Sequence, residues 1–507
     1  MNRSDLSIIA EPSLEFRHGQ RLTDPRNGLA LFGPWDADSA SRPGNVPYGV
    51  IGTSEGVDKF HAFARRMARP IVPNEERHHL RIWRPFPGFD AAFCADWPTE
   101  GAWVQEIDRT SLIRSSHLAD EYRRAAATTC AYTDALDVAA KRDEGLRVIY
   151  CIVPDEVHQN CRPESRLRAS DRIGRRPSNV ERKKRAAGQL GLLSQYDPRD
   201  YGYSVDFRRQ LKARAMAYGF PLQLLRESTL RLDSDDSPRN PRRGLTPLSD
   251  RAWNIATTTY YKAGGKPWRL STAREGVCYV GLAFRRVDTR RSAKSACCAA
   301  QMFLDTGDGV VFKGEYGPWY SEKGREFHLS RSAAHDLLKG VLETYRELGG
   351  VALREVFIHS RSMIDANEFR GYREAVDGSV KVVGVRVRSE RRDGARLFRA
   401  GKYPVQRGTL WRLNDRSALM WGSGFESELG TYRGAEVPLP IRVDIQHGEA
   451  DIECVATDIM GLTKLNYNSC KSGDRLPVTI GFSDKVGEIL IENGELKQAH
   501  PQFKFYI

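Results

Sequence analysis

The sequence predicts an α/β protein built from two successive layered parts. One observation is the apolar run RVIYCIVP (147–154), which a proline stops and which suits a buried strand of a parallel sheet. Another is that strand and helix patterns alternate around this run, as in a sheet covered by helices. A third is a change of pattern from about residue 272, where strands and a hairpin signal predict a mixed sheet with helices.

The first part begins with short alternating elements. DPRNG (24–28) is typical of a turn, and LALF (29–32) predicts a strand after it. YGVIGTSEG (48–56) predicts a strand that ends in a loop, and VDKFHAFARRMARP (57–70) predicts the helix that follows. DEVHQNCRP (155–163) begins another helix directly after the buried strand.

The second part begins after a helix at AWNIATTTYYKAGGKPWRL (252–270), which Gly264-Gly265 breaks. We place a boundary there, so that the parts are 1–270 and 271–507. Beyond it an amphipathic helix ended by glycines occupies 333–350, and Gly307-Asp308-Gly309 signals a hairpin. Strand patterns occur in GVCYVGLAFRR (276–286), SACCAAQMFLDTGDGVVFKGEYGPW (295–319) and REVFIHSRS (354–362).

The chain is strongly basic, with a net charge of +13 over 507 residues. Large basic proteins often bind a polyanion, although surface charge also serves solubility. The most charged segment, 162–185, holds ten Arg or Lys and three acidic residues. It fits a loop along a phosphate backbone and a solvated surface insert equally well.

Cysteines and apolar runs indicate a cytoplasmic protein. The nine cysteines include no CxxC pair, and the adjacent Cys297 and Cys298 are poorly placed to bridge each other. The first residues carry acids and no long apolar core, which argues against a signal peptide. No apolar run reaches the roughly 20 residues that span a bilayer.

A cluster of cationic residues is the first candidate site. FRRQLKARAMAYGFPLQ (207–223) predicts a helix with Arg208 and Lys212 on one face, followed by Gln223. Lys262 stands at the end of the next helix, before the two glycines. Together these side chains fit a terminal phosphate better than a carboxylate. Lone basic residues on helices are usually solvated, so this pattern by itself is weak.

Longer strings give the chain a resemblance to short prokaryotic Argonautes over its whole length. The strings that carry the resemblance are EPSLEFRHGQRLTDPRNGLALFGP, YYKAGGKPW, GVCYVGLAFRR, CCAAQMFLDTGDG, EVFIHSRS, DIMGLTKLNYNSCKSGDRLPVTIGFSDKVGEIL and the final FKFYI. The resemblance implies an N-terminal segment plus a Rossmann-like MID domain in 1–270, and an RNase H-like PIWI domain in 271–507. It also implies that DIMGLTKLNYNSCKSGDRLPVTIGFSDKVGEIL forms a terminal segment of sheet and helix.

The resemblance implies that the cationic cluster holds the 5′ phosphate of a guide RNA. The implied pocket consists of Arg208, Lys212, Gln223, Lys262 and Ile507. Many relatives have tyrosine or histidine where Arg208 stands, so the resemblance implies a contribution of charge from Arg208 and does not carry over stacking on the first base. The Ile507 carboxylate would add negative charge beside the phosphate, so Mg²⁺ is expected to bridge the two. A frayed terminus is the simpler alternative for Ile507.

The resemblance also implies that the PIWI domain does not cleave. Two-metal cleavage needs clustered carboxylates, but Ala283 and Ser360 stand where slicing relatives carry acids. Asp484 fits the last acidic position and remains alone there, or is a helix cap. Asp305, Asp308 and Glu315 surround the hairpin and suit turn chemistry better than catalysis. We therefore expect no enzymatic activity from this chain.

Short Argonautes work with a second protein, and the resemblance implies the same here. The expected partner is an APAZ-domain effector that carries a TIR, SIR2 or nuclease domain, with a TIR NAD(P)ase preferred. The guide RNA would pair with single-stranded target DNA, and target binding would drive an oligomer of heterodimers that defends the cell against plasmids and phages. Two other hypotheses stay open: a generic basic nucleic-acid-binding protein, and an active nuclease that uses Asp305, Asp308, Glu315 and Asp484.

Overall fold

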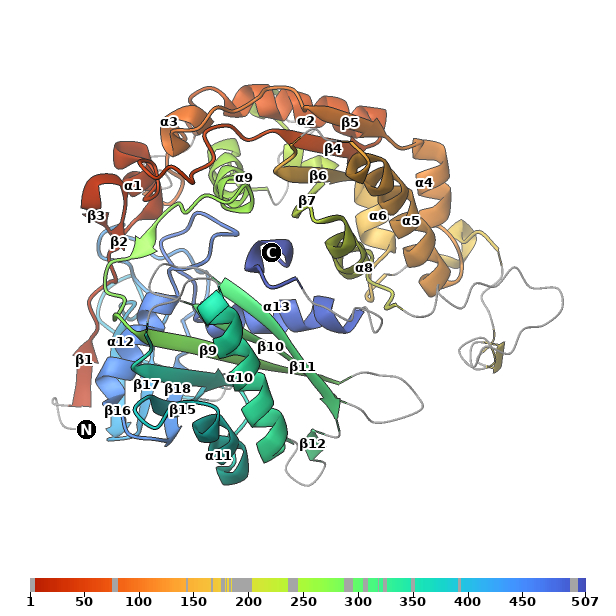
Figure 1. The fold of residues 1–507 in the computed structure, drawn as a ribbon. Helices are drawn as coiled ribbons and strands as arrows, with labels where there is room; N and C mark the ends of the chain where they lie inside the picture. Colours follow the sequence, from red (N-terminus) through yellow and green to blue (C-terminus); the bar gives the residue numbers. More distant parts are fainter. Residues whose placement is uncertain are drawn as a thin grey trace.

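The computed structural model shows two sheet-based parts with the C-terminus between them (Figure 1). It describes residues 5–74, 81–142, 145–165, 167–174, 178, 180–181, 184, 203–235, 245–286, 295–303, 309–317, 319–321, 326–347, 352–390, 394–492 and 500–507, and only the backbone at 285–286, 295–303, 309–310, 312–317, 320–321 and 491–492. A third of the basic segment 162–185 therefore lies outside the described residues, as do 236–244 of the polar linker between the helices.

The first part contains a four-stranded parallel sheet, as the sequence predicts. Its spatial order is β5 (Trp103–Glu106), β4 (Tyr48–Gly52), β6 (Val148–Val153) and β7 (Leu222–Arg226). The helices of this part are α2 (Ser54–Met67), α3 (Phe89–Phe93), α4 (Arg109–Ser116), α5 (Glu121–Ala140), α6 (Asp155–Asn160), α8 (Phe207–Ala215) and α9 (Leu248–Lys262).

The position of strand β6 in the sheet explains why its sequence is an uninterrupted apolar run. Tyr150 and its alternate neighbours pack into a core shared with α2 and α9, whereas Cys151 and its alternate neighbours pack into a core with α5 and α8. Because both faces of the strand are covered, neither set of side chains meets water. The side chains at the carboxyl ends of β6 and β7 consequently lie between two layers of helices.

The N-terminal strand predicted at LALF is wrong, because these residues belong to helix α1 (Pro25–Phe32). Asp24 caps this helix by accepting a hydrogen bond from the Arg26 N–H at 2.9 Å, and Pro25 occupies its first turn. The pattern taken for a turn is thus a helix start. A four-residue apolar run does not by itself distinguish the two structures.

The second part is a nine-stranded mixed sheet. Its order is β1 (Leu6–Ile8), β16 (Thr409–Asn414), β17 (Ser417–Met420), β18 (Ile441–His447), β15 (Lys381–Ser389), β14 (Glu355–Ser360), β9 (Val277–Arg286), β10 (Ser295–Phe303) and β11 (Gly309–Gly317). Strands β10 and β11 pair antiparallel, as the hairpin signal predicts, although the turn itself lies outside the described residues. Strand β14 pairs parallel with β9 and β15.

Helices cover both faces of this larger sheet. Side chains of α10 (Arg331–Glu347) and α11 (Ala366–Glu374) pack on one face, and those of α12 (Ile452–Leu462) and α13 (Val478–Glu492) pack on the other. The smaller elements are β2 (Leu14–Glu15), β3 (Arg21–Leu22), β8 (Arg269–Leu270), β12 (Tyr320–Ser321), β13 (Glu326–Phe327) and the 3₁₀ turns at Arg17–Gly19, Ala169–Asp171, Met216–Tyr218, Glu227–Leu230, Asp233–Asp235 and Phe503–Phe505.

Two features of the second part differ from expectation. The segment expected to contain sheet and helix near the C-terminus is α12, a loop and α13, with no strand among its described residues 458–490. Strand β1, from the start of the chain, pairs with β16 and so joins the second sheet. The boundary near residue 270 stays a prediction. Strand β1 precedes it in the sequence and yet belongs to the second sheet.

Candidate nucleic-acid interface

Helix α8 places two cations of the candidate site at different depths. Asp206 caps the helix by accepting from the Arg209 N–H at 3.1 Å, and Phe207 and Leu211 pack against the sheet and α5. This packing fixes the rotation of the helix, so that Lys212 is buried at 3% exposure while Arg208 reaches the surface. The two residues are one turn apart, as predicted, and only the second is fully enclosed.

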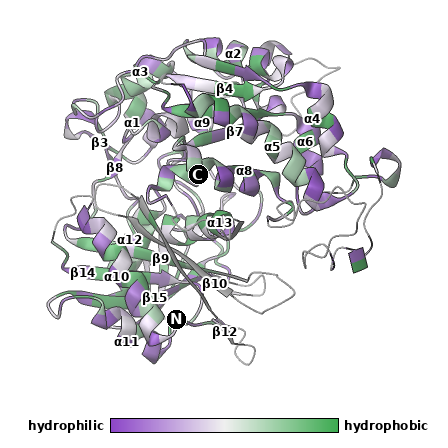
Figure 2. Cartoon of the chain, turned by 45° about the vertical axis from the view of Figure 1, so that its right-hand side comes forward, coloured by the Kyte–Doolittle hydropathy of each residue, from purple (hydrophilic) through white to green (hydrophobic). Residues whose placement is uncertain are grey.

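The Lys212 ammonium lies against the last residues of the chain. Its Nζ donates to the main-chain oxygen of Tyr506 at 3.2 Å and to that of Ile507. Ile507 is itself buried and packs in the core between the two sheets. Figures 1 and 2 both place the C-terminus beside α8. A frayed terminus, the simpler alternative for Ile507, is therefore wrong for this structure.

Lys262, at the end of α9, faces the start of β7. Its Nζ donates to the Leu222 carbonyl oxygen at 2.7 Å and to Gln223 Oε1 at 2.6 Å. The side chain is 1% exposed. Gln223 thus orients Lys262, and both lie at the edge of the parallel sheet where β6 and β7 run side by side.

The two buried lysines lack carboxylate side chains that would balance their positive charge. Among the described residues, neither Lys212 nor Lys262 has an Asp or Glu side chain as a salt-bridge partner. Lys464, which is equally buried, shows the usual solution: its Nζ lies 2.5 Å from Glu11 Oε1. The terminus at Ile507 offsets part of this charge at Lys212, whereas Lys262 donates to neutral oxygens. Because a buried charge is costly without a counter-charge, the Lys212–Lys262 cluster is a place for a further anion.

The pKa values point the same way. Burial lowers the pKa of Lys212 well below its usual value, and repulsion from Lys262, Arg208 and Lys485 adds to this. Burial likewise lowers the pKa of Lys262, and Arg208 contributes further repulsion. An anion bound among these groups would reverse the shifts, because it stabilises the charged ammonium forms. Of the five residues predicted for the phosphate pocket, Lys212 contacts Ile507 and Lys262 contacts Gln223, and the charges of Arg208, Lys212 and Lys262 are close enough to interact.

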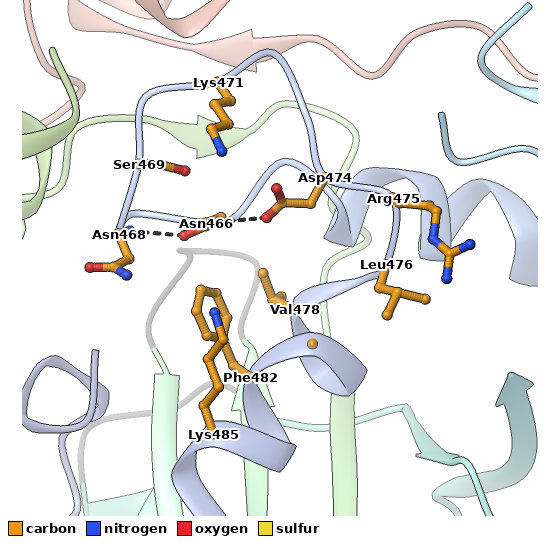
Figure 3. A pocket seen from close by; sticks show the side chains of 11 residues that line it. Asn466, Asn468, Ser469, Lys471, Asp474, Arg475, Leu476, Val478, Phe482 and Lys485 are labelled. Carbon is orange, nitrogen blue, oxygen red and sulfur yellow. Dashed lines mark hydrogen bonds between the residues drawn. The ribbon is translucent and has the colours of Figure 1, made fainter. Parts of the chain in front are cut away.

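Lys485 is a cation of this region that the sequence reasoning missed. It lies on α13, near enough to Lys212 to lower that lysine's pKa, and it lines a cavity of about 390 Å³. Figure 3 shows Asn466, Asn468, Lys471 and Arg475 around the same cavity. The string LTKLNYNSCK, which helped to carry the resemblance, supplies three of these residues and was the available signal.

A second cavity, of about 440 Å³, opens beside Arg208. His158, Arg162, Asp206 and Arg226 are among the residues that line it, with apolar side chains from β6 and β7. Burial lowers the pKa of His158, so its imidazole is held in the neutral form more strongly than in water. The cavity offers apolar surface together with hydrogen-bonding groups directly next to the cationic cluster.

The three positions expected to bear acids converge around β9 and β14. Ala283 is buried in β9, and Ser360, also buried, pairs in register with the adjoining Leu282. Asp484 lies on α13 and forms an ion pair with Arg361, whose Nη2 is 2.9 Å from Asp484 Oδ2. Among the described residues, no group of three or more His, Cys, Asp or Glu side chains is placed to hold a metal ion.

The alternative nuclease hypothesis uses three further acids around the hairpin. Asp305 and Asp308 lie outside the described residues, and for Glu315 only the backbone of β11 is described.

Within the part of the chain that the structure describes, no helix is long and apolar enough to span a bilayer.

Comparison with known proteins shows which proteins this chain is similar to in sequence and in fold. No family model matches the chain. In sequence it is similar to the Argonaute protein of Aquifex aeolicus (strain VF5), with 23% identity over 246 residues, which are 48% of this chain and 32% of that protein.

Solved Argonautes share the fold. Clostridium butyricum Argonaute, solved with a guide DNA and a 19-mer target DNA, matches with a TM-score of 0.62 and 14% identity over 99% of this chain and 54% of its own. Aquifex aeolicus Argonaute, solved with externally bound siRNA, matches with a TM-score of 0.55 and 14% identity over 100% of this chain and 56% of its own. The chain thus spans about half the length of these relatives, and it is an Argonaute-like α/β protein with the fold of the MID and PIWI regions.

Proposed function

We propose that this protein binds the 5′ phosphate of a guide RNA and uses the guide to recognise a complementary single-stranded DNA. The observation that carries the proposal is the pair of buried ammonium groups, Lys212 and Lys262, without carboxylate side-chain partners. The Ile507 carboxylate offsets one of these charges, and a terminal phosphate supplies the remaining negative charge and accepts several hydrogen bonds. The cavity beside Arg208 leaves room for the first guide base.

Mg²⁺ is part of this proposal. Mg²⁺ prefers oxygen ligands and binds proteins through one or two carboxylates plus phosphate oxygens and waters. The terminal oxygens of Ile507 and the Gln223 amide oxygen are oxygen ligands of this type, and both adjoin the lysine cluster. The donor set fits an ion shared with the guide phosphate, whose role is to offset repulsion between phosphate and carboxylate. The hydrogen bond from Lys212 Nζ to the Ile507 oxygen would keep this carboxylate in place beside the ion.

We also propose that the chain does not cleave nucleic acid. Cleavage by two metals requires several carboxylates around the ions. Of the three positions that the resemblance assigns, only Asp484 is acidic, and Arg361 already neutralises it. The competing hypothesis, an active nuclease that includes Asp484, predicts metal-dependent cleavage that Asp484→Ala abolishes.

The output of recognition is proposed to come from a second chain. The length of the match, about half of each solved relative, agrees with a short Argonaute. Such a protein would pair with an APAZ-domain effector, of which a TIR NAD(P)ase is our first choice and a SIR2 NADase or nuclease the second. Target binding would then assemble active oligomers of the heterodimer and protect a prokaryotic cell from plasmids and phages.

The test is binding of a short 5′-phosphorylated RNA and its 5′-hydroxyl twin, each with Mg²⁺ and with EDTA. Wild type should prefer the phosphorylated RNA, and Lys212→Ala should lose that preference. The loss of one hydrogen bond to a charged group costs about 1.5–3 kcal/mol, or roughly ten- to a hundred-fold in affinity. Lys339→Ala is the matched control, because Lys339 is an exposed lysine on α10 that pairs with Glu343.

Equal affinity for the two RNAs in wild type would contradict the pocket. It would leave the hypothesis of a generic basic nucleic-acid-binding protein, for which the 5′ end is irrelevant. That outcome would also remove the reason for Mg²⁺, since no phosphate would face Ile507.

A further inference from the structure

Arg361 pairs with Asp484, the one acidic residue among the three positions at which the resemblance places catalytic acids. We propose that Arg361 substitutes for the divalent cations and binds a backbone phosphate of the target strand, so that the chain grips the target without cutting it. The inference rests on the proposed function, because it presumes a guide–target duplex over β9 and β14.

Arg361 is held in position from both sides. It directly follows Ser360, at the carboxyl end of β14, and its guanidinium meets Asp484 on α13. Helix α13 is in turn fixed against the sheet: His359 Nδ1 lies 2.9 Å from Thr479 Oγ1. A Cβ added at Gly281 would lie 1.9 Å from the Thr479 carbonyl oxygen, so this glycine permits the close approach of helix and strand.

The ion pair is open to solvent on one side. The Arg361 side chain is 49% exposed and that of Asp484 is 28% exposed. Pairs with this degree of exposure contribute little to stability, about 1 kcal/mol at most. A phosphate offers a guanidinium two parallel hydrogen bonds and more charge than one carboxylate. An incoming backbone phosphate can therefore compete with Asp484 for Arg361.

Other cations lie near Arg361 and near the phosphate pocket, and two of them line the same cavity. Lys485 neighbours both Lys212 and the 390 Å³ cavity, and Arg475 lines the same cavity (Figure 3). Burial lowers the pKa of Arg475, and the nearby charge of Arg361 lowers it further. The lining of one cavity thus includes a cation near Lys212 and another near Arg361, which gives a nucleic-acid backbone positive charge to follow.

The chemistry explains binding without cleavage. A pair of metal ions both neutralises the scissile phosphate and activates the attacking water. A guanidinium supplies the first effect only, because it stays protonated and coordinates no water as a Lewis acid. Asp484 serves here to orient Arg361 until a target arrives.

The experiment uses the full chain, co-purified with its partner and loaded with a 5′-phosphorylated guide carrying a fluorophore. The affinity for complementary single-stranded DNA is measured across a series of salt concentrations. Arg361→Gln is expected to weaken target binding about tenfold and to reduce the slope of log affinity against log salt by about one, while guide affinity is unchanged. Arg361→Lys should retain part of the affinity, since it keeps the charge but loses the bidentate contact.

Two further variants make the test specific. Asp484→Asn is expected to tighten target binding a few-fold, because it removes the competitor for Arg361 without adding a cation. Arg331→Gln is the matched control: Arg331 pairs with Glu374 on the opposite face of the sheet and should not affect the target.

The inference is overturned if Arg361→Gln binds target with wild-type affinity and salt slope while its guide stays bound. Weaker target binding in Asp484→Asn would likewise contradict it, and this variant answers the question even if Arg361→Gln folds poorly. Failure of the proposed function looks different, because wild type would then show no preference for a 5′-phosphorylated guide.

Discussion

Single side chains decide what the candidate site can bind. The i, i+4 spacing of Arg208 and Lys212 made the cluster visible in the sequence, and the contacts of Lys262 with Gln223 and of Lys212 with Ile507 show that the structure closes it. The sequence could not reveal Arg361, because its importance comes from a helix more than one hundred residues away. Nor could it separate the buried Lys212 from the exposed Arg208.

At this residue scale, His359 is expected to make the protein sensitive to acid. Burial lowers its pKa to about 3, and its Nε2 is buried without a hydrogen-bond partner among the described residues. An unfolded chain has a histidine pKa of about 6.5, so between these values the unfolded state binds the extra proton. Stability should therefore fall as the pH decreases below 6.5, by about 2 kcal/mol between pH 7 and pH 5 from this residue alone.

The measurement is the free energy of unfolding in urea at pH 7, 6 and 5 for wild type and His359→Asn. The variant cannot take up this proton, so its stability should depend less on pH. Parallel pH profiles for the two proteins would show that His359 is not held neutral by the fold.

At the scale of elements, helix caps and the burial of strand faces explain which elements the sequence predicted correctly and which it did not. Strand β6 was recognisable because both of its faces are buried, which requires an unbroken apolar run. Helix α1 was misread because LALF is too short to show a helical period, although the Asp24-Pro25 start was a cap signal. Helix α9 ends at Lys262, just before the Gly264-Gly265 pair that was expected to break it.

The cap of α8 provides a test at the same scale. Asp206→Ala removes the acceptor for the Arg209 N–H, and we expect a loss of about 1 kcal/mol in unfolding free energy. Because α8 carries Arg208 and Lys212, the variant should also weaken the preference for a 5′-phosphorylated RNA.

Asp365→Ala is the control, since Asp365 caps α11 in the same way on a helix remote from the pocket. A similar loss of stability with no effect on RNA binding is expected there. If both variants affected RNA binding equally, the effect would be one of general stability.

At the scale of the whole molecule, the C-terminal segment joins the two parts. Phe503 is 1% exposed, and its ring packs edge-on against Phe482 of α13 with the centroids 5.0 Å apart. The same short segment carries Tyr506 and Ile507 to Lys212 on α8. The pocket therefore belongs to neither sheet alone.

Phe503→Ala should consequently impair stability and binding together. Deleting a buried phenylalanine side chain costs about 3–5 kcal/mol, and the loosened segment should hold Ile507 less firmly at the pocket. Chemical denaturation and the paired RNA measurement check this. Phe398→Ala, at a residue that is 76% exposed, should change stability by less than about 0.5 kcal/mol and leave binding intact.

The sequence by itself determined the local and periodic features: the parallel sheet, the helix with its two cations, the amphipathic helix α10 and the absence of acids at residues 283 and 360. These depend on neighbours in the chain or on a repeating pattern of burial. Only the tertiary structure decided which charges are buried, that β1 joins the second sheet, and that Arg361 meets Asp484. These features arise from contacts between distant segments, whose burial and charge balance no local pattern records.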